Sequence, residues 1–288
     1  MIDLHVHTTM SDGTVSPRDV VRLASRKGLR AIAITDHDTV AGIPEAQDEG
    51  RSAGVEVVAG VEISAQWSHG ILHILGYFVD FHDEQLLRAL EYLRRHRLER
   101  IPKILSKLRD EDVFISTEDI RQAAQGGVPG RPHVANVLLQ KGRVSTLQEA
   151  FDRYLKKGAP AYVRKVKLLP SEAVRVIIGA GGVAVVAHPY SLDSDDPAEF
   201  ERIVRDLADT GVQGIEAFCP RHTPEQTAFY LDLATRLDLV ATGGTDFHGS
   251  NKPKIKLGVI PGRSPLPYSI LDELRRRKPH TRDADNRT

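Results

Sequence analysis

Short apolar segments that end in histidine or carboxylate residues recur along this chain of 288 residues. The polar residues are His5 and His7, Asp36, His37 and Asp38, Glu62, His73, His188, and Asp246 with His248. In a β/α barrel the carboxyl ends of the strands meet at one rim, so side chains from many strands converge there. Imidazoles and carboxylates are common metal ligands. The pattern therefore predicts a barrel whose open end holds a metal cluster.

The first and last of these groups are expected to lie side by side. His5 and His7 are two residues apart in a strand, so both side chains project from one face. Asp246 and His248 follow the last apolar segment, and closing a sheet into a barrel brings the first strand next to the last. A single histidine in a strand is more often a surface or core residue than a ligand. The prediction depends on the joint pattern.

Strand-like and helix-like segments alternate, which favours an α/β fold with a parallel sheet. Helix signals are clear at Ser16 and Pro17 with Gly28 past the end, and at Pro44 before Gly54. His73 comes early in its strand, which indicates either an antiparallel strand or a ligand deeper in the barrel. Seven strands are predicted at residues 2–6, 31–35, 55–63, 71–79, 183–187, 214–218 and 239–242, and further helices at residues 171–178, 197–208 and 224–236.

The alternation fails between residues 81 and 169, where a long amphipathic helix is followed by a segment broken by glycine and proline. We expect an inserted, mainly helical subdomain at 81–169, a barrel formed by residues 1–80 and 170–278, and a polar tail at 279–288. The insertion is rich in Arg and Lys, which predicts either a basic lid that attracts phosphate or a solvated helix face. The candidate substrate-binding residues are Arg131, His133, Arg97 and Arg100.

Composition excludes several classes of protein. Thirty-nine Lys and Arg residues balance 39 Asp and Glu residues, so bulk attraction to nucleic acid or membrane is not expected. The single cysteine, Cys219, can form neither an internal disulfide nor a zinc-finger site. No apolar run approaches the roughly 20 residues that span a bilayer, and the start lacks the features of a signal peptide. We expect a cytoplasmic protein without membrane association, and the sequence indicates no protein partner.

Seven motifs closely resemble, in order, those of the PHP (polymerase and histidinol phosphatase) superfamily. They lie at residues 5–7 (HVH), 11–13 (SDG), 34–38 (ITDHD), 60–64 (GVEIS), 73–76 (HILG), 187–189 (AHP) and 244–248 (GTDFH). The insertion with Arg131 and His133 and the segment 181–189 (GGVAVVAHP) resemble the branch of 3',5'-nucleotide bisphosphate phosphatases and 5'-to-3' exoribonucleases. The resemblance implies a distorted seven-stranded (β/α) barrel and two or three divalent ions.

By the same resemblance, His5, His7, Glu62 and Asp246 hold one ion. Glu62 bridges to a second ion bound by His73 and His188, and Asp12, His37 and His248 hold a third. Only the resemblance implicates Asp12, because spacing alone assigns it to a turn before Gly13. Nitrogen and oxygen ligands suit manganese, iron or zinc. Manganese is favoured because the oxygens of a phosphate are hard ligands.

The implied chemistry is metal-assisted hydrolysis of a phosphomonoester, with Glu62 and Asp246 as catalytic residues that hold the ions. His222 is the candidate proton donor to the leaving oxygen, and Glu216 is a competing candidate whose simpler explanation is a buried structural carboxylate. The expected substrate is a phosphorylated small molecule, most simply a 3',5'-nucleotide bisphosphate. Short RNA cleaved from its 5' end, histidinol or sugar phosphates, and a metal-stabilised binding module without activity are the alternatives.

Overall fold

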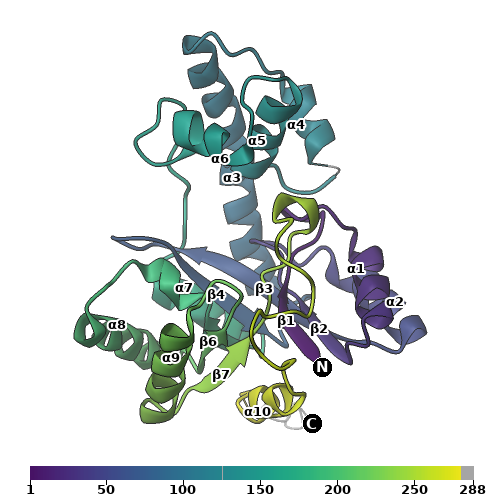
Figure 1. Ribbon diagram of the computed structural model, residues 1–288, viewed down its shortest axis with the longest axis vertical. Coiled ribbons are helices and arrows are strands. Elements are labelled where there is room, and N and C mark those ends of the chain that lie inside the picture. Colours follow the sequence, from purple (N-terminus) through teal and green to yellow (C-terminus); the bar gives the residue numbers. More distant parts are fainter. Residues whose placement is uncertain (125, 280–288) are drawn as a thin grey trace, which may run out of the picture.

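A seven-stranded sheet, rolled into a nearly closed barrel, forms the body of the computed structural model, which describes residues 1–124 and 126–279 (Figure 1). The sheet order follows the chain order. The strands are β1 (Ile2–Val6), β2 (Ala31–Ile34), β3 (Glu56–Ala65), β4 (Leu72–Tyr77), β5 (Val183–Val186), β6 (Gly214–Phe218) and β7 (Val240–Gly243). The predicted number of strands and the α/β class are confirmed.

One strand runs against the others, and this explains the position of His73. Strand β4 is antiparallel to both β3 and β5, whereas the neighbouring pairs β1–β2, β2–β3, β5–β6 and β6–β7 are parallel. The amino end of β4 therefore lies at the same rim as the carboxyl ends of the parallel strands. His73 is the second residue of β4. Of the two alternatives left by the sequence, the antiparallel strand is confirmed.

The barrel is closed by the segment after β7. Phe247 pairs with Val6, and His7 N donates to Phe247 O at 2.9 Å. The buried carboxylate of Asp3 fastens this seam, because it accepts from Thr245 N at 2.9 Å, Thr245 Oγ1 at 2.6 Å and Gly258 N at 2.8 Å. The seam therefore places Asp246 and His248 next to β1, close to His5 and His7.

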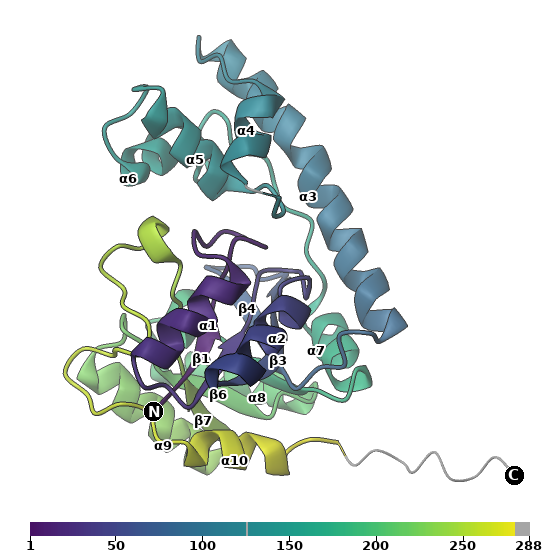
Figure 2. The same cartoon turned by 90° about the vertical axis from the view of Figure 1, so that its right-hand side faces the viewer.

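Helices cover the outside of the barrel (Figures 1 and 2). Helix α1 begins where predicted, since the Ser16 side chain accepts from Asp19 N, and α2 ends at Gly54, whose φ of +67° suits glycine. The covering helices are α1 (Pro17–Arg26), α2 (Ile43–Ala53), α7 (Pro170–Gly179), α8 (Pro197–Asp209), α9 (Pro224–Arg236) and α10 (Ser269–Arg276), with short 3-10 turns η2 (Pro189–Leu192) and η3 (Gly249–Asn251). No helix in the described part of the chain is both long and apolar enough to cross a membrane.

The segment between β4 and α7 is helical and stands above the barrel rim (Figure 2). It has its own cluster of buried apolar side chains, among them Ile104, Leu108, Val134 and Leu138. We propose on this basis that residues 81–169 are an inserted subdomain. Its elements are α3 (Glu84–Asp110), α4 (Thr117–Ala123), α5 (Arg131–Gln140), α6 (Leu147–Ala150) and the π-helical turn η1 (Phe151–Leu155). Of the predicted polar tail, all but Pro279 lies outside the described residues.

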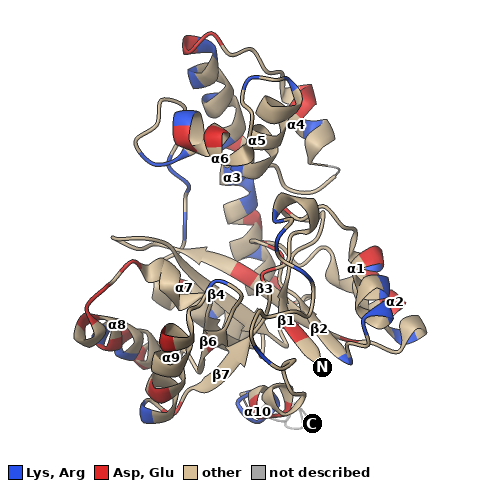
Figure 3. Cartoon of the chain, in the orientation of Figure 1, with Lys and Arg blue, Asp and Glu red and all other residues tan. Residues whose placement is uncertain are grey.

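The basic residues of α3 divide into two groups. The first group is exposed and comprises Arg88, Arg94, Arg95, Lys103, Lys107 and Arg109. Figure 3 shows blue, basic segments along the α3 ribbon. Arg97 and Arg100 are buried, and only 6% of the surface of each residue is exposed. Most of the charge run is therefore a solvated helix face, and the basic lid stays a prediction.

Candidate metal centre

The nine predicted ligand residues lie together at one rim of the barrel. Within each of four overlapping groups, ligand atoms lie within 4.8 Å of one another. The groups are His7, Asp12, His37 and His248; His5, Glu62 and His188; His5, His7 and Asp246; and His37, Glu62 and His73. The division differs from the implied one, because His7 also joins the group of Asp12, and His5 also joins Glu62 and His188.

Glu62 is at the centre of these groups and is fully buried. Its Oε1 lies 2.8 Å from His73 Nδ1 and 2.9 Å from His188 Nε2. Its Oε2 lies 3.0 Å from His37 Nδ1 and 3.1 Å from His7 Nε2. One carboxylate thus faces imidazoles from four strand ends, which is the arrangement of a residue that bridges ions.

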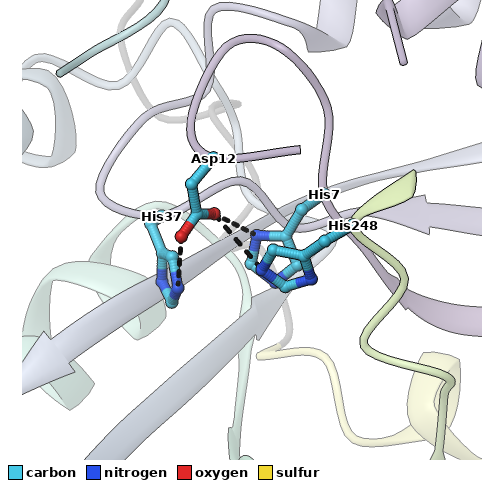
Figure 4. Close-up of side chains that lie close together, drawn as sticks. All are labelled: His7, Asp12, His37 and His248. Carbon is cyan, nitrogen blue, oxygen red and sulfur yellow. Dashed lines mark ion pairs between the residues drawn. The ribbon is translucent and has the colours of Figure 1, made fainter. Parts of the chain in front are cut away.

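Asp12 reaches the centre from the loop after β1 (Figure 4). Its carboxylate lies 3.2 Å from His248 Nε2, 3.8 Å from His7 Nδ1 and 3.9 Å from His37 Nε2. Asp36 shapes this loop, because its carboxylate accepts from Thr8 N at 2.8 Å and from the Ser11 hydroxyl at 2.5 Å. Asp36 therefore positions a ligand loop and is absent from the four groups.

Asp246 completes the rim on the side of β7. Its Oδ1 lies 3.4 Å from His7 Nε2 and 3.7 Å from His5 Nε2, while Oδ2 accepts from Lys252 Nζ at 2.5 Å. The backbone of Asp246 has a φ of +56°, and those of Asp38 and His188 have φ of +54° and +25°. Residues that are not glycine rarely adopt these angles, and such strain gathers at functional sites.

The electrostatics keep the carboxylates ionised. Burial raises the pKa of Glu62 and Asp12, but the facing imidazoles lower it more, so both lie well below the ordinary range. Burial lowers the pKa of His73 to about 3 and that of His248 to about 4. In contrast, Asp246 and Glu62 raise the pKa of the buried His7 to about 9, so His7 must lose a proton before it binds an ion. Ionised carboxylates and neutral imidazoles are the forms that bind metal ions.

Two buried atoms test whether this site suits metal ions. Glu62 Oε2 and His37 Nδ1 have no hydrogen-bond partner among the described residues, although they lie 3.0 Å apart. Buried polar atoms without partners are rare and costly in folded proteins. The His5 and His7 Nε2 atoms also face one another at 3.1 Å. Lone pairs aimed at common points rather than at donors fit divalent ions, and the nitrogen and oxygen ligands suit first-row transition metals.

Glu216 of β6 hydrogen-bonds to two of the predicted ligand residues, His5 and His188. Its fully buried carboxylate accepts from His5 Nδ1 at 2.9 Å and from His188 N at 2.6 Å. The first bond leaves the Nε2 of His5 free to face the rim, as in other metal sites whose histidines donate to a carboxylate. The sequence indicates a buried structural carboxylate here, and the structure gives it this positioning role.

The four predicted substrate-binding residues all lie in the insertion, on α3 and the first turn of α5. Arg97 pairs with Asp38 at 2.5 Å, and Arg100 Nε donates to Val163 O at 2.7 Å. Arg131 Nη1 donates to Leu155 O at 3.0 Å, and His133 Nδ1 accepts from Gly130 N at 2.9 Å. Burial lowers the pKa of both Arg131 and His133.

Helix α5 is tied to the metal centre through Asn251. Asn136 Nδ2 donates to Asn251 Oδ1 at 2.9 Å, and Asn251 Nδ2 donates to Asp12 O at 2.7 Å. The backbone of Gly127 also packs on the ligand loop, since an added Cβ would lie 1.9 Å from Thr9 O. The helix that carries Arg131 and His133 therefore has a fixed position relative to Asp12.

The predicted proton donor, His222, lies behind the rim. Its Nδ1 hydrogen-bonds to Ala217 O at 2.9 Å, so this nitrogen carries the proton. The ring packs 5.5 Å from that of Tyr190 and 5.0 Å from that of Tyr230, and burial lowers the pKa of the imidazole. In this arrangement His222 Nε2 presents a lone pair, and donation from it requires the protonated ring, which burial disfavours.

The chain is similar to several characterised bacterial proteins. It is 31% identical to a 3',5'-nucleoside bisphosphate phosphatase of Chromobacterium violaceum, over 96% of this chain and 97% of the relative. It is 33% identical to a 5'-3' exoribonuclease of Haemophilus influenzae, over 85% and 89%. It is 35% identical to a phosphoribosyl 1,2-cyclic phosphate 1,2-diphosphodiesterase of Eggerthella lenta, over 90% and 96%.

Solved structures share the fold. A protein of Bifidobacterium adolescentis, described as a proposed metal-dependent phosphoesterase, superposes with a TM-score of 0.85 at 31% identity and covers 96% of both chains. An amidohydrolase of Chromobacterium violaceum, solved with sulfate and without metal, gives 0.84 at 31% identity and covers 99% of both. The PHP domain matches residues 3–163 of this chain. With that match and relatives aligned along most of their length, the chain belongs to the PHP family.

Proposed function

We propose that this protein is a metal-dependent phosphoesterase that hydrolyses a phosphate monoester of a nucleotide. The most fitting reaction converts a 3',5'-nucleotide bisphosphate to a nucleoside monophosphate and phosphate. The observation that carries the proposal is the central position of Glu62, whose two oxygens face five imidazoles at a rim next to a basic insertion. The bisphosphate phosphatase of Chromobacterium violaceum, with which the chain aligns over 96% of its length, supports this substrate.

Divalent ions at the rim would polarise the phosphoryl oxygens and lower the pKa of bound water from 15.7 towards roughly 7. We propose two or three ions, with manganese favoured and zinc or iron possible. The chain's own residues would do the rest. The nine rim residues hold the ions, and Glu216 keeps the Nε2 of His5 turned towards them.

The insertion would bind and orient the substrate. Arg131 and His133 lie on the helix that Asn251 ties to the loop of Asp12, so a phosphate bound by the rim would come close to α5. The proton on His133 resides on Nε2, because its Nδ1 accepts from Gly130 N. Positive charge beside a rim rich in carboxylates would attract the anionic substrate by electrostatic focusing. The proposed activity belongs in the cytoplasm, where free nucleotides and short RNA occur.

A second candidate function is 5'-to-3' exonuclease activity on short oligoribonucleotides. The observation that favours it is the similarity to exoribonucleases of Haemophilus influenzae and Escherichia coli, each 33% identical. The same rim would hydrolyse the ester, and the insertion would contact the adjacent sugar and phosphate. A histidinol or sugar phosphatase needs only one anion site, which leaves the basic residues of the insertion without a role.

The test compares turnover of adenosine 3',5'-bisphosphate, a 5'-phosphorylated RNA dinucleotide and histidinol phosphate by the manganese-loaded protein. The proposal predicts the highest kcat/KM for the bisphosphate. Preference for the dinucleotide would establish the exonuclease, and preference for histidinol phosphate would establish the third alternative. Inactivity on all three by metal-replete protein would contradict the proposal and favour a metal-stabilised binding module.

A further inference from the structure

A separate group of hydrogen-bond donors lies where β5, β6 and β7 end. Lys252 follows β7 and η3, and its Nζ contacts Asp246 Oδ2 at 2.5 Å. Tyr190 lies in η2 after β5, with its ring centre 5.9 Å from that of His188. Arg221 follows β6, and its Nη1 donates to the Tyr190 hydroxyl at 3.3 Å. Three strand ends thus bring donors to the edge of the metal centre, away from the Arg97–Asp38 pair after β2.

Arg221 is an exposed residue whose charge is not neutralised by a carboxylate among the described residues. Among the described residues no carboxylate lies within ion-pair distance of its guanidinium, and its hydrogen-bond partner is a neutral phenol. The arginines of the neighbouring helices α8 and α9 differ, because Arg205 and Arg236 both pair with Glu201. Burial lowers the pKa of Arg221, but Tyr190 and Asp246 raise it more, so the guanidinium stays charged.

The chemistry of this group suits a phosphate oxyanion. Arginine and lysine carry only donors, and a guanidinium matches two phosphate oxygens at once. Lys252 uses one of its three N–H groups on Asp246, which leaves others for a ligand. An anion bound here would lie beside Asp246 and His188, so it would belong to a molecule that also reaches the metal centre.

The two residues expected to bind a second phosphate, Arg97 and Arg100, are both buried, and Arg97 is already paired with a carboxylate. The Arg97 guanidinium pairs with Asp38, to which Lys165 Nζ also donates at 2.7 Å. Arg100 is buried, its Nε donates to the Val163 carbonyl, and its Nη2 has no hydrogen-bond partner among the described residues. A bisphosphate needs a second anion site, and Arg221 offers a charge without a carboxylate partner in the described structure.

We propose that Arg221, supported by Lys252 and the Tyr190 hydroxyl, binds the phosphate group of the substrate that is not hydrolysed. This inference rests on the proposed function and names the residues that distinguish a bisphosphate from a monophosphate. Arg221 would contribute to substrate affinity rather than to the chemical step, since it contacts neither a metal ligand nor the reacting group.

The test uses Arg221→Ala and Arg221→Lys in the manganese-loaded full chain, with Arg202→Ala as a control that removes an exposed arginine of α8. The substrates are adenosine 3',5'-bisphosphate and the adenosine monophosphate that carries only the hydrolysed phosphate. Arg221→Ala should raise KM for the bisphosphate about tenfold, with kcat little changed and the monophosphate unaffected. Arg221→Lys should recover only part of the affinity, because lysine keeps the charge but not the paired donors of a guanidinium, and Arg202→Ala should match wild type. An equal effect on both substrates, or on neither, would overturn the inference.

A binding measurement separates this inference from the proposed function. If the wild-type protein does not hydrolyse the bisphosphate, the proposed function fails. Calorimetric titration with adenosine 3',5'-bisphosphate then tests the anion site by itself. Affinity about tenfold weaker in Arg221→Ala than in wild type and Arg202→Ala would support the site. Equal affinity in all three proteins, or no binding to wild type, would overturn it.

Discussion

Replacing Glu216 with glutamine tests how the ligands of the metal centre are held. The carboxylate accepts two hydrogen bonds, from His5 Nδ1 and from the backbone N of His188. Glutamine has nearly the same shape but only one accepting oxygen. Its NH2 group must therefore face one of these two nitrogens, whichever way the amide is turned.

Each orientation has a defined cost. If the NH2 group faces His5, Nδ1 must accept and the proton moves to Nε2, where it points at His7 Nε2, 3.1 Å away, and blocks a ligand position. If it faces His188, a buried backbone N–H loses its acceptor, which costs about 1–3 kcal/mol. The same bond steadies the strained His188 backbone, whose φ is +25°. Loss of such an outer partner typically weakens metal binding by about 10- to 100-fold.

The assay is a competitive titration of manganese against a chelating dye, together with thermal unfolding of the metal-free protein. We expect Glu216→Gln to bind manganese about 10- to 100-fold more weakly. In the second orientation the melting temperature should also fall by about 2–5 °C. Glu273→Gln is the control, because it makes the same change at an exposed residue of α10. Manganese affinity within twofold of wild type would refute the positioning role of Glu216.

Three further outcomes are expected. Asp246→Ala should lower kcat/KM by more than about 100-fold, which exceeds the usual effect of losing a group that hydrogen-bonds to a metal ligand. Far-UV circular dichroism should stay unchanged, and retained turnover would contradict the role of Asp246 as a ligand. Arg131→Ala should raise KM about tenfold or more with metal content intact, and loss of ions measured by mass spectrometry would show that our division between ligand and substrate residues is wrong. Burial lowers the pKa of His7, but Asp246 and Glu62 raise it to about 9. Its ring is therefore protonated at pH 7 and must release a proton to bind metal, so manganese affinity measured by calorimetry should rise between pH 7 and 9; affinity independent of pH would contradict this.

The sequence predicts the barrel well because the information is local. Each strand is a short apolar segment, and the helix signals at Ser16 and Gly54 are properties of neighbouring residues. The ligands His7 and His248 could be found because they follow strand ends, where the barrel brings them together. The apolar segment of β4 does not reveal its direction, which follows from antiparallel pairing with β3 across the short connection 66–71 and with β5 more than 100 residues later. The early position of His73 and a connection too short for a parallel crossover were the available signals.

The features of the site that the sequence could not predict depend on contacts between distant segments. Glu216 and His5 are 211 residues apart, so no spacing reveals that this carboxylate orients that ring. The position of Asp12 depends on a loop folded around Asp36, and resemblance alone indicated it. The charges of α3 alone could not reveal which of its basic residues are buried, because the burial of Arg97 depends on Asp38 of the barrel.

We propose that one rim, organised around Glu62, holds several divalent ions. The most direct measurement is the number of manganese ions per chain after reconstitution, determined by mass spectrometry for wild type and for Glu62→Gln. We expect two or three ions in the wild type, as in other metal clusters that hydrolyse phosphate esters, and the loss of at least one in the variant. Wild-type protein that binds no ion, or a variant that binds the full number, would contradict it.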